Sequence, residues 1–351
     1  MPQVKIERLQ EHLEPAENCN VRVKRMGNIT EVRYMSRNPE CSIKKIDRES
    51  YVNLSTGELK EFVHTESRAE NLTSVSQSLA NLRDLLNANI TDPSHCLWVT
   101  LTYKENMQDH KQLYQDFRKF HMRMCIFLKG KNLPTYEYIV AMEPQARGAW
   151  HAHLVMIFPD QAPYIPNDTL ANIWDHGFTK TKPLKDVDNV GLYLTAYLTD
   201  MELSDAILSA HGKIKGNSKS VSVVDERGNK QSKAIVKGAR LKLYPPGFRI
   251  YRTSRGIKKP EVINCTEAEA MKEVGDAPLT FERTIKITSD SGQGFNIINY
   301  RQFNKARKQQ QEGTAGTDGR QKNEESLRCR TSAVCGRFPC SFSCSRNTKV
   351  L

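Results

Sequence analysis

Residues 150–158 read WHAHLVMIF, which places His151 and His153 two positions apart in front of an unbroken apolar run. A run of this kind is typical of a buried strand. Successive side chains of a strand alternate between its two faces, so both imidazoles should lie on one face and Ala152 on the other. Two imidazoles that converge on one point can begin a divalent-metal site, and a histidine pair on a solvated edge strand is the alternative.

A second strand-like run, TYEYIVAMEP at residues 135–144, precedes the histidines and is joined to them by a short QARGA turn. This order predicts a β-hairpin. A turn centred near Arg147 places Glu143 opposite His151. A carboxylate beside two imidazoles, with coordination positions left open, suits Mg²⁺ or Mn²⁺ bound together with a substrate phosphate. We therefore expect Glu143, His151 and His153 to bind a divalent metal, and an ordinary glutamate before a turn is the alternative.

The surrounding sequence predicts an α+β fold with a central antiparallel β-sheet and flanking helices. Apolar residues at three- and four-residue spacing predict helices over about 66–89 and 110–128. CLWVTLTY, residues 96–103, is β-branched and aromatic and predicts a buried strand. Residues 167–184 are expected to form a short helix, a turn and a strand.

Two tyrosines follow in VDNVGLYLTAYLTDMEL, residues 187–203, which is predicted to be helical from about Val190. Tyr193 and Tyr197 are then at i, i+4 spacing on one helix face. The ordinary role of such residues is packing at the edge of a core. As nucleophiles they would need a metal ion nearby, because a phenol with a pKa of about 10 attacks poorly unless the phosphate is made more electrophilic.

The charge of the chain is concentrated in one segment. The 351 residues include 52 Lys and Arg against 40 Asp and Glu, a net charge of +12, and residues 213–259 carry the whole excess. In residues 242–260 the cations are interleaved with Tyr244, Phe248 and Tyr251, whose rings could stack on unpaired bases. A solvated basic surface is the alternative. The residues expected to contact DNA are Lys242, Arg249, Tyr251, Arg252, Arg255, Lys258 and Lys259.

Several features that would indicate other classes of protein are not found in the sequence. No GxxxxGK(S/T) motif occurs, so no P-loop motor is expected in the chain. The first residues are charged and lack the apolar core of a secretory signal, and no apolar run is long enough for a membrane span. A cytoplasmic protein with reduced cysteines and no membrane contact is therefore expected.

Taken together, these motifs resemble the rolling-circle replication initiators of the HUH endonuclease superfamily, in which two histidines flank one hydrophobic residue. The three matching motifs are WVTLTY at 98–103, HAHLVMIF at 151–158 and VGLYLTAYLTD at 190–200. WDHGF at 174–178 and the stretch at 238–260 are similar to the replication proteins of Gram-positive plasmids and integrative elements, which are grouped with phage nickases of the gene II type.

The resemblance covers roughly residues 60–260 and implies the HUH fold and a metal-dependent, site-specific DNA endonuclease and strand transferase. Tyr193, Tyr197 or both would attack the DNA and leave a 5′-phosphotyrosine and a free 3′-OH. Many relatives have a lysine just before the second tyrosine and another three residues after it, where this chain has Ala196 and Asp200. Their role would fall to Lys180, Lys182 or Lys185, or be absent.

The expected function is that of a replication initiator of a mobile element, which nicks and rejoins origin DNA presented as a single strand or an extruded hairpin. Its partners would be that DNA, a host helicase and a host DNA polymerase, and self-association on DNA is compatible with this role. The alternatives are an HUH transposase or mobilisation relaxase, or a non-catalytic DNA-binding protein.

Four parts are expected along the chain: an N-terminal segment of unknown role, a nicking core, a basic DNA-binding extension and a disordered tail. Their bounds are 1–60, 61–210, 211–300 and 301–351. From about Lys305 the sequence is rich in Gln, Gly, Lys and Glu, which cannot bury a core. The four cysteines after it lack the paired spacing of a structural zinc site and are expected to be incidental.

Overall fold

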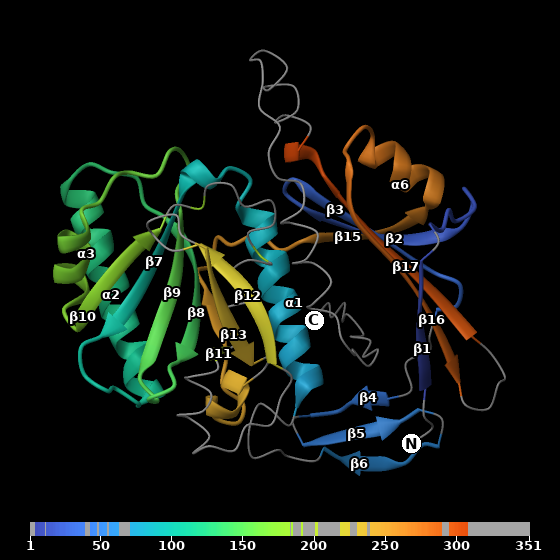
Figure 1. Cartoon of the computed structure of the whole chain (residues 1–351), viewed down its shortest axis with the longest axis horizontal. Helices are drawn as coiled ribbons and strands as arrows, with labels where there is room; N and C mark the ends of the chain where they lie inside the picture. The colour runs from blue at the N-terminus through green and yellow to red at the C-terminus, as the bar shows by residue number, and fades with distance from the viewer. Residues whose placement is uncertain are drawn as a thin grey trace, which may run out of the picture. The chain divides into compact units, whose positions relative to one another are not determined.

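The computed structural model describes most of the chain, and its contacts divide the described residues into two compact units. The described residues are 4–10, 12–38, 43–47, 49–54, 56–62, 71–182, 184, 191, 201–202, 218–224, 230–236, 239–289 and 295–307. Unit 1 comprises those within 1–24, 29–65 and 262–351, and unit 2 those within 25–28 and 66–261. Each unit is described by itself below (Figure 1).

Unit 2 is built on a five-stranded sheet with the strand order β10-β7-β9-β8-β14 and antiparallel pairing throughout. Its strands are β7 (Cys96–Tyr103), β8 (Glu137–Pro144), β9 (Trp150–Ile157), β10 (Gly177–Lys182) and β14 (Tyr251–Thr253). The other elements of the unit are the helices α1 (Leu72–Asn89), α2 (His110–Gly130) and α3 (Asn167–Trp174), the 3₁₀ turns η2 (Pro93–His95) and η3 (Ala239–Leu243), and the small sheet of β11 (Met201–Glu202), β13 (Lys230–Val236) and β12 (Ser218–Val224). The predicted α+β class is confirmed.

The sequence of α2 explains why these residues form a helix that packs on the sheet. The Asp109 side chain accepts a hydrogen bond from the Lys111 backbone N–H, which caps the first turn. The apolar residues then recur every three or four positions, so they form one buried stripe against the sheet. The buried apolar residues of this stripe are Leu113, Phe117, Phe120, Met124 and Leu128. The predicted helix over 110–128 and the predicted strand over 96–103 are confirmed. Helix α1 begins at Leu72, and residues 66–70 of its predicted range lie outside the described residues.

The hairpin of β8 and β9 has the register that the sequence predicts. Glu143 pairs with His151, and Ala141 pairs with His153. The turn is closed by the Gln145 N–H donating to the Ala149 carbonyl at 2.7 Å, and Gly148 has φ of 87°, which favours glycine. This register places the glutamate beside the histidine pair.

Unit 1 contains a six-stranded sheet with the strand order β1-β16-β17-β3-β2-β15, and a small sheet of β4, β5 and β6. The strands of the larger sheet are β1 (Val4–Leu9), β2 (Asn20–Met26), β3 (Ile29–Met35), β15 (Glu261–Thr266), β16 (Leu279–Ser289) and β17 (Phe295–Asn304). The remaining elements are β4 (Ile43–Lys45), β5 (Ser50–Asn53), β6 (Leu59–Glu61) and α6 (Glu267–Val274).

The two compact units differ from the four-part division expected from the sequence. Strand β1 pairs with β16 and β3 with β17, so the N-terminal segment forms one sheet with residues assigned to the basic extension. Strand β14, from the same extension, belongs to the sheet of the histidine pair. The first residues assigned to the tail belong to β17, and residues 308–351 lie outside the described residues. In the part of the chain that is described, no helix is long and apolar enough to cross a membrane.

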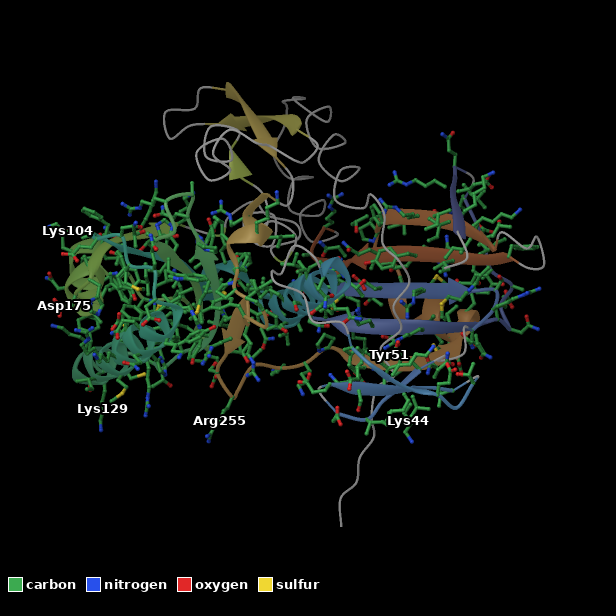
Figure 2. The ribbon with its side chains drawn as sticks, turned by 90° about the horizontal axis from the view of Figure 1, so that it is seen from below. Lys44, Tyr51, Lys104, Lys129, Asp175 and Arg255 are labelled. Carbon is green, nitrogen blue, oxygen red and sulfur yellow. The ribbon has the colours of Figure 1, made fainter. Side chains whose placement is uncertain are left out.

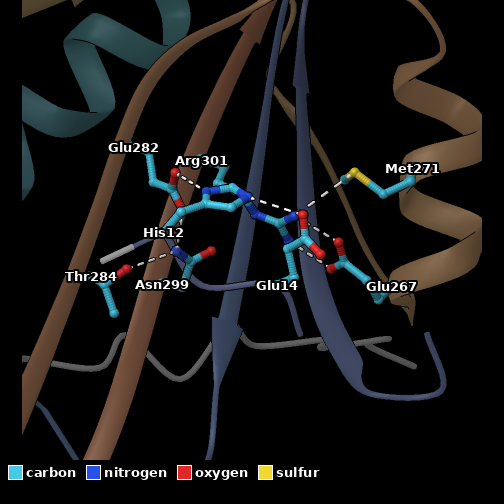
Figure 3. A network of polar contacts seen from close by, with 8 residues as sticks. All are labelled: His12, Glu14, Glu267, Met271, Glu282, Thr284, Asn299 and Arg301. Carbon is cyan, nitrogen blue, oxygen red and sulfur yellow. Dashed lines mark hydrogen bonds and ion pairs between the residues drawn. The ribbon is translucent and has the colours of Figure 1, made fainter. Parts of the chain in front are cut away.

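A buried ion pair joins the helix of unit 1 to its sheet. Both guanidinium Nη atoms of Arg301, on β17, lie 2.6 Å from carboxylate oxygens of Glu267, on α6, and both side chains are buried. Figure 3 shows this pair beside a second polar group, in which the Asn299 side chain donates to Thr284 and Glu282. A charge removed from water in this way is tolerated only while its partner is present.

Removing one partner of this pair should therefore destabilise unit 1 strongly. We expect Glu267→Ala to lower the free energy of unfolding by about 3–5 kcal/mol, because the Arg301 charge is left buried and unpaired. Urea denaturation followed by circular dichroism measures this change. The double variant Glu267→Leu/Arg301→Met should recover most of the loss.

The exposed pair of Lys5 and Glu7, also at 2.6 Å, gives the matched control. Glu7→Ala should change stability little, since water and salt screen an exposed pair. Equal effects of Glu7→Ala and Glu267→Ala would contradict this account of the buried pair.

Candidate functional site

His151 and His153 share one face of the five-stranded sheet, here called the histidine face. Residues paired directly across an antiparallel ladder point to the same side, so the pairing of Thr100 with His153 and of Glu143 with His151 places all four residues on it. The side chains agree with the backbone, since Thr100 Oγ1 lies 3.3 Å from His153 Nδ1.

The opposite face of the sheet packs against α2 and α3. The Tyr103 hydroxyl, on that face, donates to the buried Asp116 of α2 at 2.9 Å. Trp174, at the end of α3, contacts the rings of both Tyr103 and Phe120. Core residues fill this opposite face. A site formed by the histidines therefore lies on the histidine face.

Glu143 lies at the centre of a cluster of polar side chains that also contains His151 and His153. Its Oε2 is 2.6 Å from His153 Nε2, and only 7% of the residue is exposed. Burial by itself raises the pKa of Glu143, but the opposing effects of His153, Arg240 and His151 are together larger and hold the pKa below its usual value. The carboxylate is therefore ionised at neutral pH.

His151 completes the group with a ring nitrogen that has no partner in the described part of the chain. Its Nε2 is buried and forms no hydrogen bond with any described residue. Burial is the main cause that lowers the pKa of His151 to about 4, and the neighbouring Glu143 opposes this only in part. A neutral imidazole keeps a nitrogen lone pair available as a ligand.

Arg240 is a member of this cluster that the sequence did not predict. It comes from η3, and its Nη1 lies 2.5 Å from Glu143 Oε1 and 2.8 Å from the Pro144 carbonyl oxygen. The Tyr244 hydroxyl donates to the Met142 carbonyl at 3.0 Å and so fixes η3 against the same strand. In the sequence Arg240 is one of many cations of a basic segment, and no spacing marks it as the one that folds back.

The donor set fits a divalent metal ion by its chemistry. The described residues contain no preformed cluster of three or more His, Cys, Asp or Glu side chains that could hold a metal. The cluster nevertheless offers an ionised carboxylate, a neutral imidazole whose buried nitrogen has no described partner, and a second imidazole whose Nδ1 contacts Thr100. Metal-binding histidines commonly use their second ring nitrogen in this way, and metal-binding carboxylates are commonly held by a further hydrogen bond, as Arg240 holds Glu143.

Tyr193 and Tyr197 lie outside the described residues, but Gly191 fixes the start of their segment. Its N–H donates to Asn87 Oδ1 of α1 at 3.1 Å, and both groups are buried. A Cβ at this position would lie 2.5 Å from the Arg83 carbonyl oxygen, so only glycine allows this approach. The chain therefore passes directly against α1 two residues before Tyr193.

The residues predicted to contact DNA are distributed over more than one face. Six cations are exposed, namely Lys242, Arg249, Arg252, Arg255, Lys258 and Lys259, and Figure 2 shows Arg255 pointing outward. Tyr251 is half-buried and lies on the histidine face, paired with Ala141. Arg252 lies on the opposite face, where its guanidinium stacks 3.5 Å from the centre of the Tyr114 ring.

The expectation that Tyr244 and Phe248 stack on bases is wrong. Tyr244 is 1% exposed and Phe248 5% exposed, and the Phe248 ring stacks on Trp150 with centroids 4.7 Å apart. The physical reason is that this segment returns to the sheet and ends in β14, so its aromatic residues fill the core instead of facing solvent.

Two of the three lysines considered as substitutes for those of the relatives lie on strand β10. Lys180 and Lys182 pair with Thr100 and Trp98 of β7, which places both on the histidine face. The Lys182 ammonium lies 5.4 Å from the centre of the Trp98 ring. Lys185 lies outside the described residues.

Residues 96–202 match the family described as Replication-associated protein ORF2/G2P. No match was found to a curated protein, and none to a solved structure. The matched region runs from β7 to β11 and includes the hairpin, the histidine pair and the predicted tyrosine segment. It supports a role of the chain as a replication initiator.

Metal binding can be measured directly on the apoprotein. We expect Mn²⁺ titration followed by electron paramagnetic resonance to show one site in the wild type. His151→Ala and His153→Ala should reduce its affinity by more than about 100-fold, and Arg240→Ala, which removes only an outer contact, by about 10- to 100-fold. His95→Ala, a partly exposed histidine of η2, is the control and should bind normally. Unchanged Mn²⁺ affinity in His151→Ala, His153→Ala and Arg240→Ala would exclude this site.

Proposed function

We propose that this protein is a rolling-circle replication initiator, which nicks and rejoins single-stranded origin DNA through a tyrosine with the help of a divalent metal. The observation that carries the proposal is the cluster on the histidine face, where an ionised, buried carboxylate contacts one imidazole. A second imidazole has a buried nitrogen with no partner among the residues that the structure describes. Glu143, His151 and His153 lie within the region that matches the replication-associated family, and Arg240 contacts Glu143.

Glu143, His151 and His153 would hold the ion, for which Mg²⁺ or Mn²⁺ is the proposed identity. A bound divalent ion of this kind supplies charge that makes the scissile phosphate more electrophilic and orients it. Arg240 keeps the Glu143 carboxylate in place, and Thr100 orients the His153 ring through its Nδ1.

The phenolic oxygen of Tyr193 or Tyr197 would attack the phosphorus. The new bond is a phosphodiester between tyrosine and the 5′ end of the DNA, and the bond to the 3′ oxygen breaks. The phenol loses its proton and the leaving 3′ oxygen gains one, so a free 3′-OH results. The phosphotyrosine retains the energy of the broken bond, which allows rejoining without ATP.

The exposed cations from Lys242 to Lys259 would contact the phosphates of origin DNA, whether single-stranded or in a hairpin. A host polymerase would extend the 3′-OH and a host helicase would unwind the duplex, in a cytoplasmic setting. Self-association on DNA is compatible with this scheme.

A nicking assay tests the proposal. Purified protein is incubated with Mn²⁺ and single-stranded DNA carrying the element's origin, and the products are resolved on a denaturing gel. We expect a covalent protein–DNA band that is lost in the variant Tyr193→Phe/Tyr197→Phe. Loss in one single variant identifies the nucleophile, and loss only in the double variant means that either tyrosine can serve. Tyr164→Phe, at an exposed tyrosine outside the motif, should leave the band unchanged.

The result that would overturn the proposal is tight DNA binding without any covalent band on any DNA. It would identify a non-catalytic DNA-binding protein. A band formed only on transfer-origin or transposon-end DNA would instead identify a relaxase or a transposase that uses the same residues.

A further inference from the structure

The WDHGF motif at residues 174–178 is fixed in the fold but has no part in the chemistry proposed above. Trp174 is fully buried, and its indole N–H donates to the Thr102 carbonyl at 3.0 Å. Asp175 ends α3 with φ of 63°, and its N–H donates to the Ala171 carbonyl. The His176 carbonyl accepts the Lys104 N–H at 2.9 Å. The first three residues of the motif are therefore held by contacts within the fold.

Gly177 brings this turn against the end of β7. A Cβ at position 177 would lie 2.4 Å from the Lys104 nitrogen and 2.5 Å from the Thr102 carbonyl oxygen, and φ is 150°. No other residue fits so close to a neighbouring backbone. The turn is thus rigid, and the direction of the next side chain is set by β10.

Two residues of the motif are exposed. Asp175 pairs with Arg123 at 3.3 Å, whereas the Phe178 ring projects into solvent. Phe178 is 67% exposed and lies on β10, an edge strand of the five-stranded sheet. The ladder pairs Phe178 with Thr102, Thr102 with His151, and His151 with Glu143, so all lie in one row of the histidine face. Two strand spacings separate Phe178 from His151, which is about 10 Å between their backbones.

Lys180 has the same relation to the second histidine. It is exposed, it points to the same side as Phe178, and it pairs with Thr100, which in turn pairs with His153. Thr179, between them, faces the other side, is buried and donates to the Asn167 carbonyl at 3.1 Å. Strand β10 thus presents an aromatic ring and then a cation along the edge of the histidine face.

We propose that β10 is a binding track for single-stranded DNA, in which Phe178 stacks on an unpaired base and Lys180 contacts a phosphate. An exposed phenylalanine by itself is ordinary. On β10, an aromatic ring and a cation lie at alternate positions of one strand, in register with His151 and His153 across β7. This combination binds single-stranded nucleic acid without reading its sequence, because the ring stacks on a base and the cation contacts a phosphate. The inference rests on the proposed function for its ligand, and it assigns Phe178 and Lys180 a role in positioning the strand beside His151 and His153.

Stacking can be observed with an introduced indole. The native tryptophans Trp98, Trp150 and Trp174 are all buried, so Phe178→Trp adds the one exposed indole. We expect its fluorescence to be quenched by a thymidine oligonucleotide in the absence of metal, with saturation. Tyr164→Trp, which places an indole at an 88% exposed position after the end of β9, is the matched control and should not be quenched.

Affinity gives a second, independent readout. By fluorescence anisotropy, Phe178→Ala should bind the same oligonucleotide about 5- to 150-fold more weakly, and Tyr164→Ala normally. Lys180→Gln should reduce the slope of log affinity against log salt by about 0.7. Thermal unfolding of Phe178→Ala should match the wild type, because the removed ring is exposed.

The outcomes separate this inference from the proposed function. If the wild type binds and nicks DNA but the indole at position 178 is not quenched and Phe178→Ala binds normally, only the binding track is overturned. If the wild type forms no covalent product yet Phe178→Trp is quenched, the track stands and the nicking proposal fails. Quenching that follows protein concentration without DNA would mean that Phe178 contacts a second copy of the chain, and would overturn the track.

Discussion

The register of the β8–β9 hairpin is the constraint on which the site depends. A slip of one residue would turn every side chain of one strand to the other face, and would separate Glu143 from the two histidines. The register is fixed at the turn by the contact between Gln145 and Ala149. It is fixed along the strand by the buried apolar residues that alternate with the histidines. The polar cluster is thus a consequence of how the core is packed.

Burial then determines the chemistry of the cluster. Away from water, Glu143 remains charged because His153 and Arg240 each contact one of its oxygens, and His151 remains neutral because a charge there would be costly. Arg240 comes from a segment about a hundred positions further along the chain. The return of that segment to β8 as β14 therefore completes both the sheet and the site.

The local features of the site were predictable from the sequence, and the long-range ones were not. The strand of residues 96–103 and the pairing of Glu143 with His151 follow from apolar alternation and turn length, which are local signals. The place of Arg240, the burial of Tyr244 and Phe248, and the pairing of the N-terminal strands with β16 and β17 depend on contacts between distant segments. A basic segment has the same appearance in the sequence whether its aromatic residues face solvent or fill a core. Phe178 was quoted only as a letter of a motif, because its exposure is visible only in the fold.

We propose that Glu143, His151 and His153 act together as one metal site on the histidine face. Anomalous diffraction from crystals of the protein grown with Mn²⁺ tests it most directly. We expect one strong peak within coordination distance of Glu143 Oε2 and of a nitrogen of each histidine, with Arg240 still in contact with the other carboxylate oxygen. A peak at another position, or an unchanged contact between Glu143 and His153 with Mn²⁺ bound elsewhere, would contradict it.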